Sequence, residues 1–267
     1  MSKEYDTVFS LGEACFCATF LSKLRLRKFS APFDWMYGAT FDERFEILLD
    51  DFNNFIDKED LSFVGRRDRP NPQDVYYDKR TGITFNHDFQ YNGDFAKDYP
   101  KVREKYDKRI KRLLHYLEKG GHVLMVYMEL PGSEQGVSSL EKLKELMAVI
   151  SRKYANAEID ILYIKHDENM ADHDFRCEQI TSQITIGYCF NKDRISDVEN
   201  SGNLENVRNL FSDITCKEQI TDKYLYLLRC AVKKIIKVFY QKRIKNGEYY
   251  VRILGIKLVI RAAPSQR

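Results

Sequence analysis

Residues 6–24, DTVFSLGEACFCATFLSKL, decide how the chain begins to fold. The apolar run over residues 6–11 predicts a short buried strand, and Gly12 ends it. Apolar side chains then recur at helical spacing over residues 14–24, which predicts a helix whose first turn contains Cys15. A strand, a glycine and a helix in this order are typical of a sheet with helices packed on it.

The same alternation continues along the chain. We expect further helices over residues 41–52, 99–117, 138–154 and 224–245, and strands over residues 74–77, 83–89, 122–128, 158–164 and 184–190. Residues 64–74 have the composition of an exposed loop, and residues 249–260 alternate like a hairpin. The predicted fold class is therefore α+β or α/β, with one central sheet over residues 1–190 and helices packed on it.

Composition separates a body from a tail. The 267 residues carry a net charge of +3, yet residues 229–267 hold eleven Lys or Arg and a single acid, Glu248, so the rest is net acidic. We predict a catalytic domain over residues 1–219 and a basic appendage over residues 220–267. The chain contains no run of eighteen apolar residues, so no transmembrane helix is predicted.

The cysteines fit a reducing compartment. We expect no export signal, because the first residues are acidic where a signal peptide is basic. Six cysteines in such a chain are expected to be free thiols, and a cytoplasmic location follows. We predict no metal site: there is no Cys-x-x-Cys, and the acidic stretch over residues 166–174 matches no metal-binding spacing.

Cys15 is the candidate nucleophile. Unpaired N–H groups and the positive end of the helix dipole meet at the first turn of a helix, and both favour a thiolate. Backbone N–H groups of Gly12 and Cys15 would stabilise an oxyanion there, and Gly12 would let a substrate approach the backbone. The alternative for Cys15 is core packing, which is the interpretation we adopt for Cys17.

His87 is the candidate base, because it alternates with Phe85 and Phe89 on a predicted strand and would be held in a partly buried sheet. Its alternative is a structural core histidine. Asp34 is the candidate for orienting it, with Glu129 as the other choice, and Trp35 is the candidate for substrate contact. Asp34 could instead cap the turn that follows it.

Three segments carry a family resemblance: residues 10–21, the Pro-Phe-Asp-Trp sequence at residues 32–35, and the His-Asp-Phe sequence that begins at His87. In this order they resemble a bacterial family of uncharacterised papain-like cysteine peptidases, over about residues 5–165. The resemblance implies a papain-like site that falls on Cys15 and His87. A similar arrangement of these segments belongs to a capsule-polysaccharide acetyltransferase that uses coenzyme A.

These observations lead to three functional hypotheses. The first is acyl transfer through Cys15 and His87, with acetyl-coenzyme A as donor and a surface glycan precursor as acceptor. The second is a peptidase or amidase that uses the same pair. The third is a non-catalytic adaptor for glycosyltransferases that is held at a membrane by its tail.

The basic tail suggests an anionic partner. The predicted helix over residues 224–245 is amphipathic, with Lys233, Lys237 and Lys242 on its polar side. We expect these lysines to face the inner surface of a membrane, or else to lie in water while the helix packs on the body. Nucleic acid is not expected as a partner, because the body is acidic and the tail lacks the pattern of an RNA-binding sheet.

Overall fold

A computed structural model describes residues 3–68, 72–171, 174–190, 208–217, 240–245, 248–253 and 256–260. The chain divides into two compact units, residues 1–217 and 218–267. In the described residues, no helix is both long enough and apolar enough to cross a membrane.

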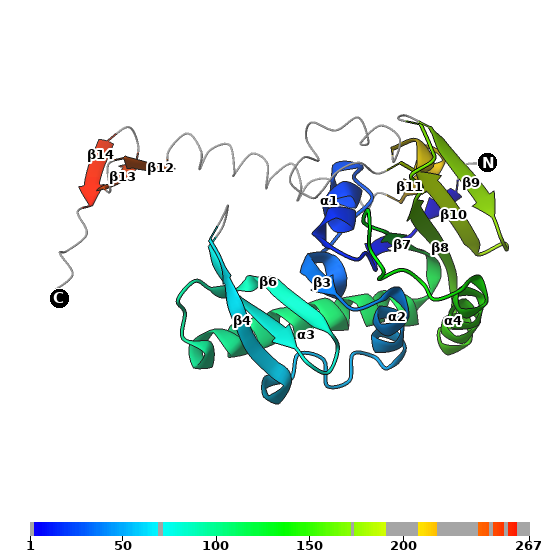
Figure 1. Cartoon of the computed structure of the whole chain (residues 1–267), viewed down its shortest axis with the longest axis horizontal. Coiled ribbons are helices and arrows are strands. Elements are labelled where there is room, and N and C mark those ends of the chain that lie inside the picture. Colours follow the sequence, from blue (N-terminus) through cyan, green and yellow to red (C-terminus); the bar gives the residue numbers. More distant parts are fainter. Residues whose placement is uncertain are drawn as a thin grey trace. The chain divides into compact units, whose positions relative to one another are not determined.

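The first unit is built on a five-stranded sheet (Figure 1). Its strands, in spatial order, are β2 (Thr7–Ser10), β7 (Gly121–Met128), β8 (Ala157–His166), β10 (Ile184–Cys189) and β9 (Phe175–Gln179). The first four are parallel and β9 is antiparallel to β10. The inner strand β7 is buried over its last six residues, as expected for a parallel strand covered on both faces.

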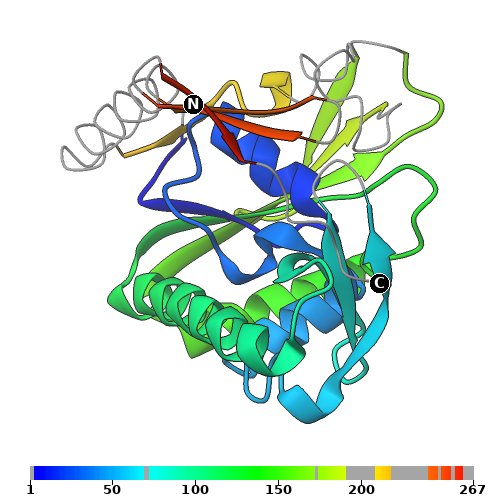
Figure 2. The same ribbon diagram turned by 90° about the vertical axis from the view of Figure 1, so that its left-hand side faces the viewer.

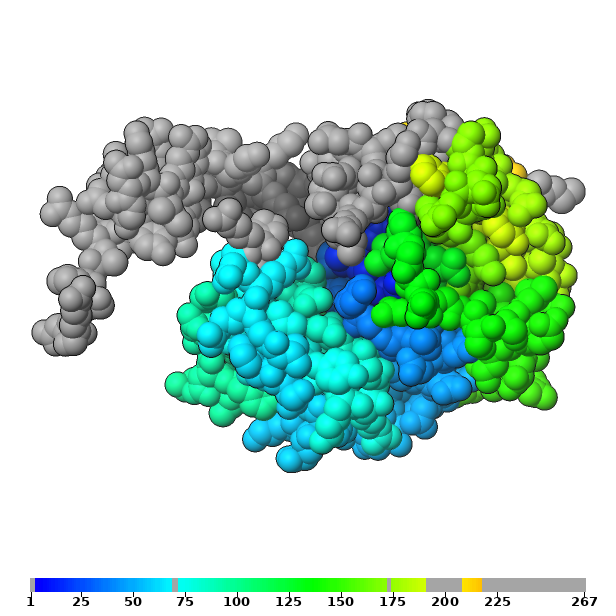
Figure 3. Space-filling view, in the orientation of Figure 1, coloured from blue at the N-terminus to red at the C-terminus, as the bar shows by residue number. Residues whose placement is uncertain are grey.

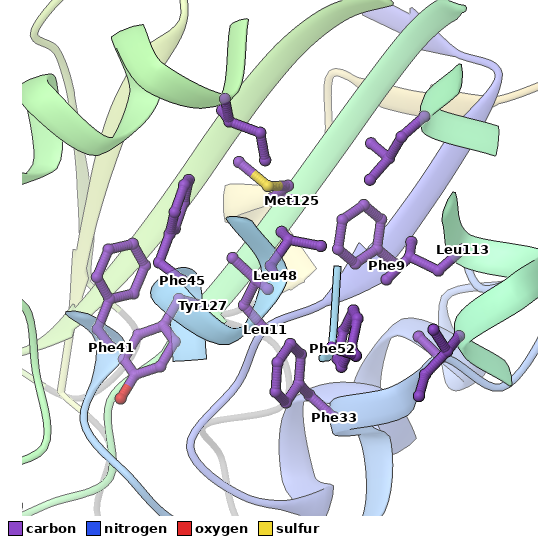
Figure 4. Close-up of a cluster of buried hydrophobic side chains, with 14 of the residues drawn as sticks. Phe9, Leu11, Phe33, Phe41, Phe45, Leu48, Phe52, Leu113, Met125 and Tyr127 are labelled. Atoms are coloured by element: carbon purple, nitrogen blue, oxygen red, sulfur yellow. The ribbon is translucent and has the colours of Figure 1, made fainter. Parts of the chain in front are cut away.

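Helices cover both faces of this sheet (Figure 2). Along β7, Val123, Met125 and Tyr127 enter one apolar core, whereas Leu124, Val126 and Met128 enter the other. The first core contains side chains of α2 (Phe41–Leu49), α3 (Phe95–Lys119) and α4 (Leu140–Lys153), and the second contains those of α1 (Cys15–Lys23). Figure 4 shows the larger core around Phe9, Met125 and Tyr127. Alternation along one strand thus places α1 on the face opposite the other three helices.

A second sheet corrects the expectation of one sheet. Four antiparallel strands lie in the order β3 (Met36–Gly38), β6 (Ile83–Gln90), β5 (Gln73–Asp78) and β4 (Leu61–Arg67). Helix α3 packs on one face of this sheet, where Phe85 contacts Tyr106 edge to face. This part of the chain, coloured cyan, forms much of the surface seen in Figure 3.

Boundaries differ from the sequence prediction in several places, and two of these differences have a clear physical reason. Residues 64–67, expected in a loop, belong to β4, and residues 65–67 pair with β5, because an edge strand tolerates charged and exposed side chains. Helix α2 ends at Leu49 and not at residue 52, since Asp51 and Phe52 have positive φ angles that a helix cannot accommodate. The mixed α/β fold class is confirmed, and the four-stranded sheet stands beside the sheet that the sequence predicts.

Two 3-10 turns and two short strands complete the described part of the first unit. A 3-10 turn, η1 (Pro32–Trp35), precedes β3, and a second, η2 (Lys58–Asp60), precedes β4. Strand β1 (Lys3–Tyr5) pairs in parallel with β11 (Ile214–Cys216). This pairing accounts for part of the segment over residues 191–219, which the sequence pattern does not place.

The second unit contains a three-stranded antiparallel sheet of β12 (Tyr240–Lys245), β13 (Glu248–Ile253) and β14 (Ile256–Ile260). The hairpin predicted over residues 249–260 corresponds to β13 and β14. The prediction of a helix that continues to residue 245 is wrong for β12. The backbone of this strand pairs residue for residue with β13, so its hydrogen bonds are made across the ladder. Lys242 is on this strand, and Lys233 and Lys237 lie outside the described residues.

Candidate active site

Cys15 is the first residue of α1, directly beyond the end of β2. Strand β2 is parallel to β7, so its carboxyl end belongs to the edge where open α/β sheets bind ligands. The N-cap residue, Ala14, has no side-chain hydrogen bond to the first turn. Cys15 is partly buried. The predicted strand, glycine and helix are therefore present, with the thiol at the helix N-terminus.

The pKa of Cys15 does not follow the sequence expectation. Burial raises it, and this effect outweighs the lowering by the Arg67 charge and by the backbone N–H of Cys15. The free energy needed to remove a thiolate from water is larger than the stabilisation that the helix terminus and one nearby cation provide. At neutral pH the thiol is consequently protonated in the resting protein.

Gly12 has a different role from the one expected. A Cβ at this position would lie 2.4 Å from Cβ of Cys17 and 2.9 Å from Oγ of Ser10. The Gly12 N–H donates a hydrogen bond to Oγ of Ser10 at 2.9 Å. Glycine is required here because α1 packs closely on the end of β2, and its N–H is already engaged and does not serve an oxyanion.

Cys17 is a packing residue, as predicted. Its thiol is buried and donates a long hydrogen bond to the Val126 carbonyl, with 3.6 Å between sulfur and oxygen. Burial raises the pKa of this thiol to about 12. Cys17 is therefore both inaccessible and protonated.

His87 is aimed by an irregularity in β6. Between the pairs Tyr76↔Phe85 and Asp74↔Phe89, β6 has three residues where β5 has one. The bulge breaks the simple alternation that the sequence predicts, and it changes the direction in which side chains point. Asp88 turns toward α3, where it pairs with Lys105 and accepts a hydrogen bond from the Tyr106 hydroxyl at 2.9 Å.

The His87 ring instead contacts Trp35 and Arg67. The ring centroids of His87 and Trp35 are 6.2 Å apart in an edge-on arrangement. Nη1 of Arg67 lies 3.3 Å from Nε2 of His87. Burial lowers the pKa of His87, the charge of Arg67 lowers it further, and Asp88 opposes both. The imidazole is therefore neutral at pH 7, the form that a base requires.

Arg67 links the two candidate residues. It is the last residue of β4, and its charge lowers the pKa of Cys15 as well as that of His87. His87 thus contacts both Trp35 and Arg67, and the charge of the same guanidinium acts on the Cys15 thiol. No sequence pattern points to Arg67, because it belongs to a charged stretch that has the composition of a loop.

Asp34 is not bonded to His87, which corrects its predicted role as a direct orienter. Its fully buried carboxylate pairs with Arg27 and accepts a hydrogen bond from the Ala31 N–H at 2.9 Å. Arg27 in turn lies over the Trp35 ring, 5.4 Å from its centroid. Asp34 therefore reaches His87 only through Arg27 and Trp35. The bond from Ala31 closes the turn that contains Asp34, η1, and not a turn after it, which was the alternative expected from the sequence.

The other predicted orienter, Glu129, has a different partner. It accepts a hydrogen bond from the Tyr163 hydroxyl at 2.6 Å.

Replacing Asp34 with asparagine is expected to change the pH dependence of stability. Burial raises the pKa of Asp34 to about 6, so the folded chain holds a proton that the unfolded chain loses near pH 4. Between about pH 4 and pH 6 the free energy of unfolding therefore falls as the pH rises. Relative to Asp34→Asn, the wild type should lose about 3 kcal/mol of unfolding free energy from pH 4 to pH 7.

Urea denaturation at the two pH values measures this difference. Asp107→Asn, which changes a half-exposed carboxylate in an ion pair with Arg103, serves as the control and should show less than about 1 kcal/mol of such change. A constant difference between wild type and Asp34→Asn across the range would contradict the prediction.

Arg44 is a second residue that sequence reasoning missed. Its fully buried guanidinium donates to the carbonyls of Glu13, Gly38 and Ala39 at 2.9, 2.6 and 3.3 Å. It thereby ties α2 to the loop that precedes Cys15. A signal existed: Arg44 shares the apolar face of α2 with Phe41, Phe45 and Leu48.

The sequence is similar to that of a known protein family. A family model described as "Putative papain-like cysteine peptidase" matches residues 6–169, a range that includes Cys15, Asp34 and His87. A protein of Acanthamoeba polyphaga mimivirus named "Uncharacterized protein R408" is 25% identical over 177 residues, which are 61% of this chain and 78% of the viral protein. No solved structure matches the chain. Because the family model spans more than half of the residues, the chain belongs to this family of papain-like cysteine peptidases.

Proposed function

We propose that the chain catalyses acyl transfer, with Cys15 as nucleophile and His87 as its base. The observation that carries the proposal is the position of the Cys15 thiol at the start of α1, in the field of the same arginine that contacts His87. A thiol, a neutral imidazole and a cation are the groups that attack on a carbonyl needs.

The chemistry proceeds in two halves. Sγ of Cys15 bonds to the acyl carbon while its proton passes to His87, and the carbonyl electron pair moves to oxygen. Collapse of this intermediate restores the carbonyl and expels the leaving group, which takes the proton from the imidazolium. In the second half His87 deprotonates an acceptor, which attacks the thioester carbonyl. Collapse of this second intermediate re-forms the carbonyl and expels the sulfur of Cys15, which takes the proton back from His87.

The acceptor decides between transfer and hydrolysis. We favour a sugar hydroxyl as acceptor and acetyl-coenzyme A as donor, as the resemblance to a capsule-polysaccharide acetyltransferase suggests. The family description supports the rival, in which the donor is a peptide or amide and the acceptor is water. Both proceed through the same acyl-enzyme.

Trapping this acyl-enzyme tests the proposal. Wild-type protein is incubated with acetyl-coenzyme A or with an amide substrate library, quenched in acid and digested with trypsin. Cys15 and Cys17 fall in one tryptic peptide, residues 4–23, so tandem mass spectrometry must assign the acyl group. Acylation of Cys15 is expected, and absence of an adduct with every donor would defeat the proposal. Release as a sugar ester or as free acid then separates transferase from hydrolase.

The pH profile of Cys15 reactivity should report the base. Because burial and Arg67 lower the pKa of His87, the rate of alkylation by iodoacetamide should rise with pH through a midpoint below about 6.5. In a His87→Gln variant this midpoint should vanish. A single rise above about pH 9 should remain, since the pKa of Cys15 is raised. Persistence of the acid midpoint in His87→Gln would show that another group is the base.

A further inference from the structure

Glu13 is a buried carboxylate that the proposed chemistry does not use. The residue is 1% exposed, and it lies two positions before Cys15 in the turn that joins β2 to α1. Burying a carboxylate is unfavourable unless hydrogen-bond donors meet it inside the protein. The groups that Glu13 contacts therefore indicate its role.

Glu13 is held by both its main chain and its side chain. Nη2 of Arg44 donates to the Glu13 carbonyl at 2.9 Å, and Oε2 of Glu13 accepts a hydrogen bond from the Leu130 N–H at 2.9 Å. Arg44 belongs to α2, whereas Leu130 lies in the loop that follows β7. Glu13 thus joins the start of α1 to two other parts of the first unit.

The start of α1 depends on these bonds because the helix has no polar cap of its own. Its N-cap residue is Ala14, whose methyl side chain cannot accept a hydrogen bond from the first turn. In α2 and α4, by contrast, the side chains of Thr40 and Ser139 accept such a bond. The orientation of the first turn of α1, and with it that of Cys15, is therefore fixed by contacts outside the helix, and Glu13 makes two of them.

The loop that Glu13 binds, residues 129–137, leaves the sheet at the same edge as Cys15. Strands β2 and β7 are adjacent and parallel, so the segments that follow them meet where open α/β sheets bind ligands. The Tyr127 hydroxyl, on β7, donates to the Gln135 carbonyl at 2.7 Å and so fixes the loop to the sheet. Glu13 therefore bonds the turn that contains Cys15 to a loop whose position the sheet defines.

We propose that Glu13 is a positioning residue, which holds the first turn of α1 against this loop so that the Cys15 thiol is aligned for attack on the acyl carbon. The inference rests on the proposed function and deepens it, because it names what orients the nucleophile. Without the bond to the Leu130 N–H the turn is free to shift. A displacement of about 1 Å is enough to slow a bond-forming step about 10²-fold.

Two substitutions at Glu13 separate the hydrogen bond from the charge. Glu13→Leu removes the acceptor for the Leu130 N–H and keeps a buried side chain of similar size. Glu13→Gln keeps an oxygen that can accept this bond and removes only the negative charge near Arg44. Glu129→Leu is the matched control, because it removes a carboxylate from the same loop, one that accepts from the Tyr163 hydroxyl at 2.6 Å, and leaves the Leu130 bond in place.

The experiment measures acylation of the full chain by p-nitrophenyl acetate, with the rate in Cys15→Ser subtracted. The sulfur bonds to the acyl carbon, the thiol proton passes to His87, and p-nitrophenolate leaves with the electron pair of the broken ester bond. In Glu13→Leu the limiting rate should fall about 10²-fold, while the ester concentration that gives half of this rate stays within about threefold. Glu13→Gln and Glu129→Leu should stay within about fivefold of wild type in both quantities.

Two further measurements separate misalignment from loss of structure. Iodoacetamide above about pH 9 reacts with the free thiolate without help from His87, so its rate at Cys15 should change less than about twofold in Glu13→Leu. Urea unfolding shows whether each variant is folded. If Glu13→Leu does not fold, Glu13→Asp takes its place. This variant withdraws the carboxylate by one methylene, and its limiting rate should fall about tenfold.

The possible outcomes are distinct. A folded Glu13→Leu or Glu13→Asp protein with the wild-type limiting rate would overturn the role of Glu13 and leave Cys15 and His87 in place. An equal fall in Glu13→Gln would assign the effect to the charge, and an equal fall in Glu129→Leu would assign it to the loop as a whole, so either result would also overturn it. A wild-type protein acylated no faster than Cys15→Ser would instead defeat the proposed function, and this inference with it.

Discussion

A Cys15→Ser variant is expected to lose acyl-transfer turnover by at least about 10⁴-fold while remaining folded. A serine hydroxyl at the same place is a far weaker nucleophile, and a neutral imidazole does not compensate for the difference. Cys15 is only partly buried, so the exchange of sulfur for oxygen should cost little stability. Steady-state turnover, with the midpoint of urea unfolding as the folding check, measures both effects.

The same exchange two residues away is the control for this prediction. Cys17→Ser alters a buried thiol whose hydrogen bond to the Val126 carbonyl a hydroxyl can reproduce. Turnover in Cys17→Ser should stay within a few fold of wild type. If Cys17→Ser were inactive and Cys15→Ser active, the nucleophile would be the other sulfur of the Cys-x-Cys pair and the site would have to be rebuilt around it.

Arg44→Met is expected to destabilise the fold by about 3–5 kcal/mol, the largest effect of any single substitution considered for stability. The change leaves the carbonyls of Glu13, Gly38 and Ala39 without their shared donor inside the protein. Burial lowers the pKa of Arg44 to about 10, which still leaves it charged at neutral pH. The guanidinium therefore bonds to these carbonyls as a cation, and charge-assisted bonds are the stronger kind.

Urea denaturation measures this loss, with Arg103→Met as the control. Arg103 also donates to a carbonyl, that of Phe55 at 2.6 Å, but its side chain is 33% exposed and water replaces the lost bond. The control should cost less than about 1.5 kcal/mol. Equal losses in the two variants would show that Arg44 is not a buried clamp. Since Arg44 holds the carbonyl of Glu13, residual folded Arg44→Met should also alkylate more slowly at Cys15.

Much of the scaffold could be predicted from the sequence. The helix that begins at Cys15 and the strand over residues 122–128 were predicted to within one or two residues. Each depends on a local pattern, apolar spacing or a continuous apolar run, that needs no distant partner. The strand β4 was missed for the converse reason: only pairing with β5 makes a charged, exposed segment extended.

The candidate site divides in the same way. Sequence order and residue type were enough to select Cys15 and His87, and the predicted packing role of Cys17 follows from its helix position. Sequence order and residue type could not show that Asp34 pairs with Arg27 or that Arg67 contacts His87. Nor could they show that the side chain of Cys17 leaves room only for glycine at residue 12. Each of these contacts joins segments whose relative placement no local pattern encodes.

By itself the sequence determined a thiol at the start of a helix and a histidine on a later strand, because backbone propensity and apolar periodicity act over a few residues. The tertiary structure alone decided where the histidine points and which charge stands beside it. A bulge of three residues against one re-aims His87, and an edge strand two positions across the sheet supplies Arg67. Such contacts depend on strand register and sheet order, which are set by the packing of the whole domain.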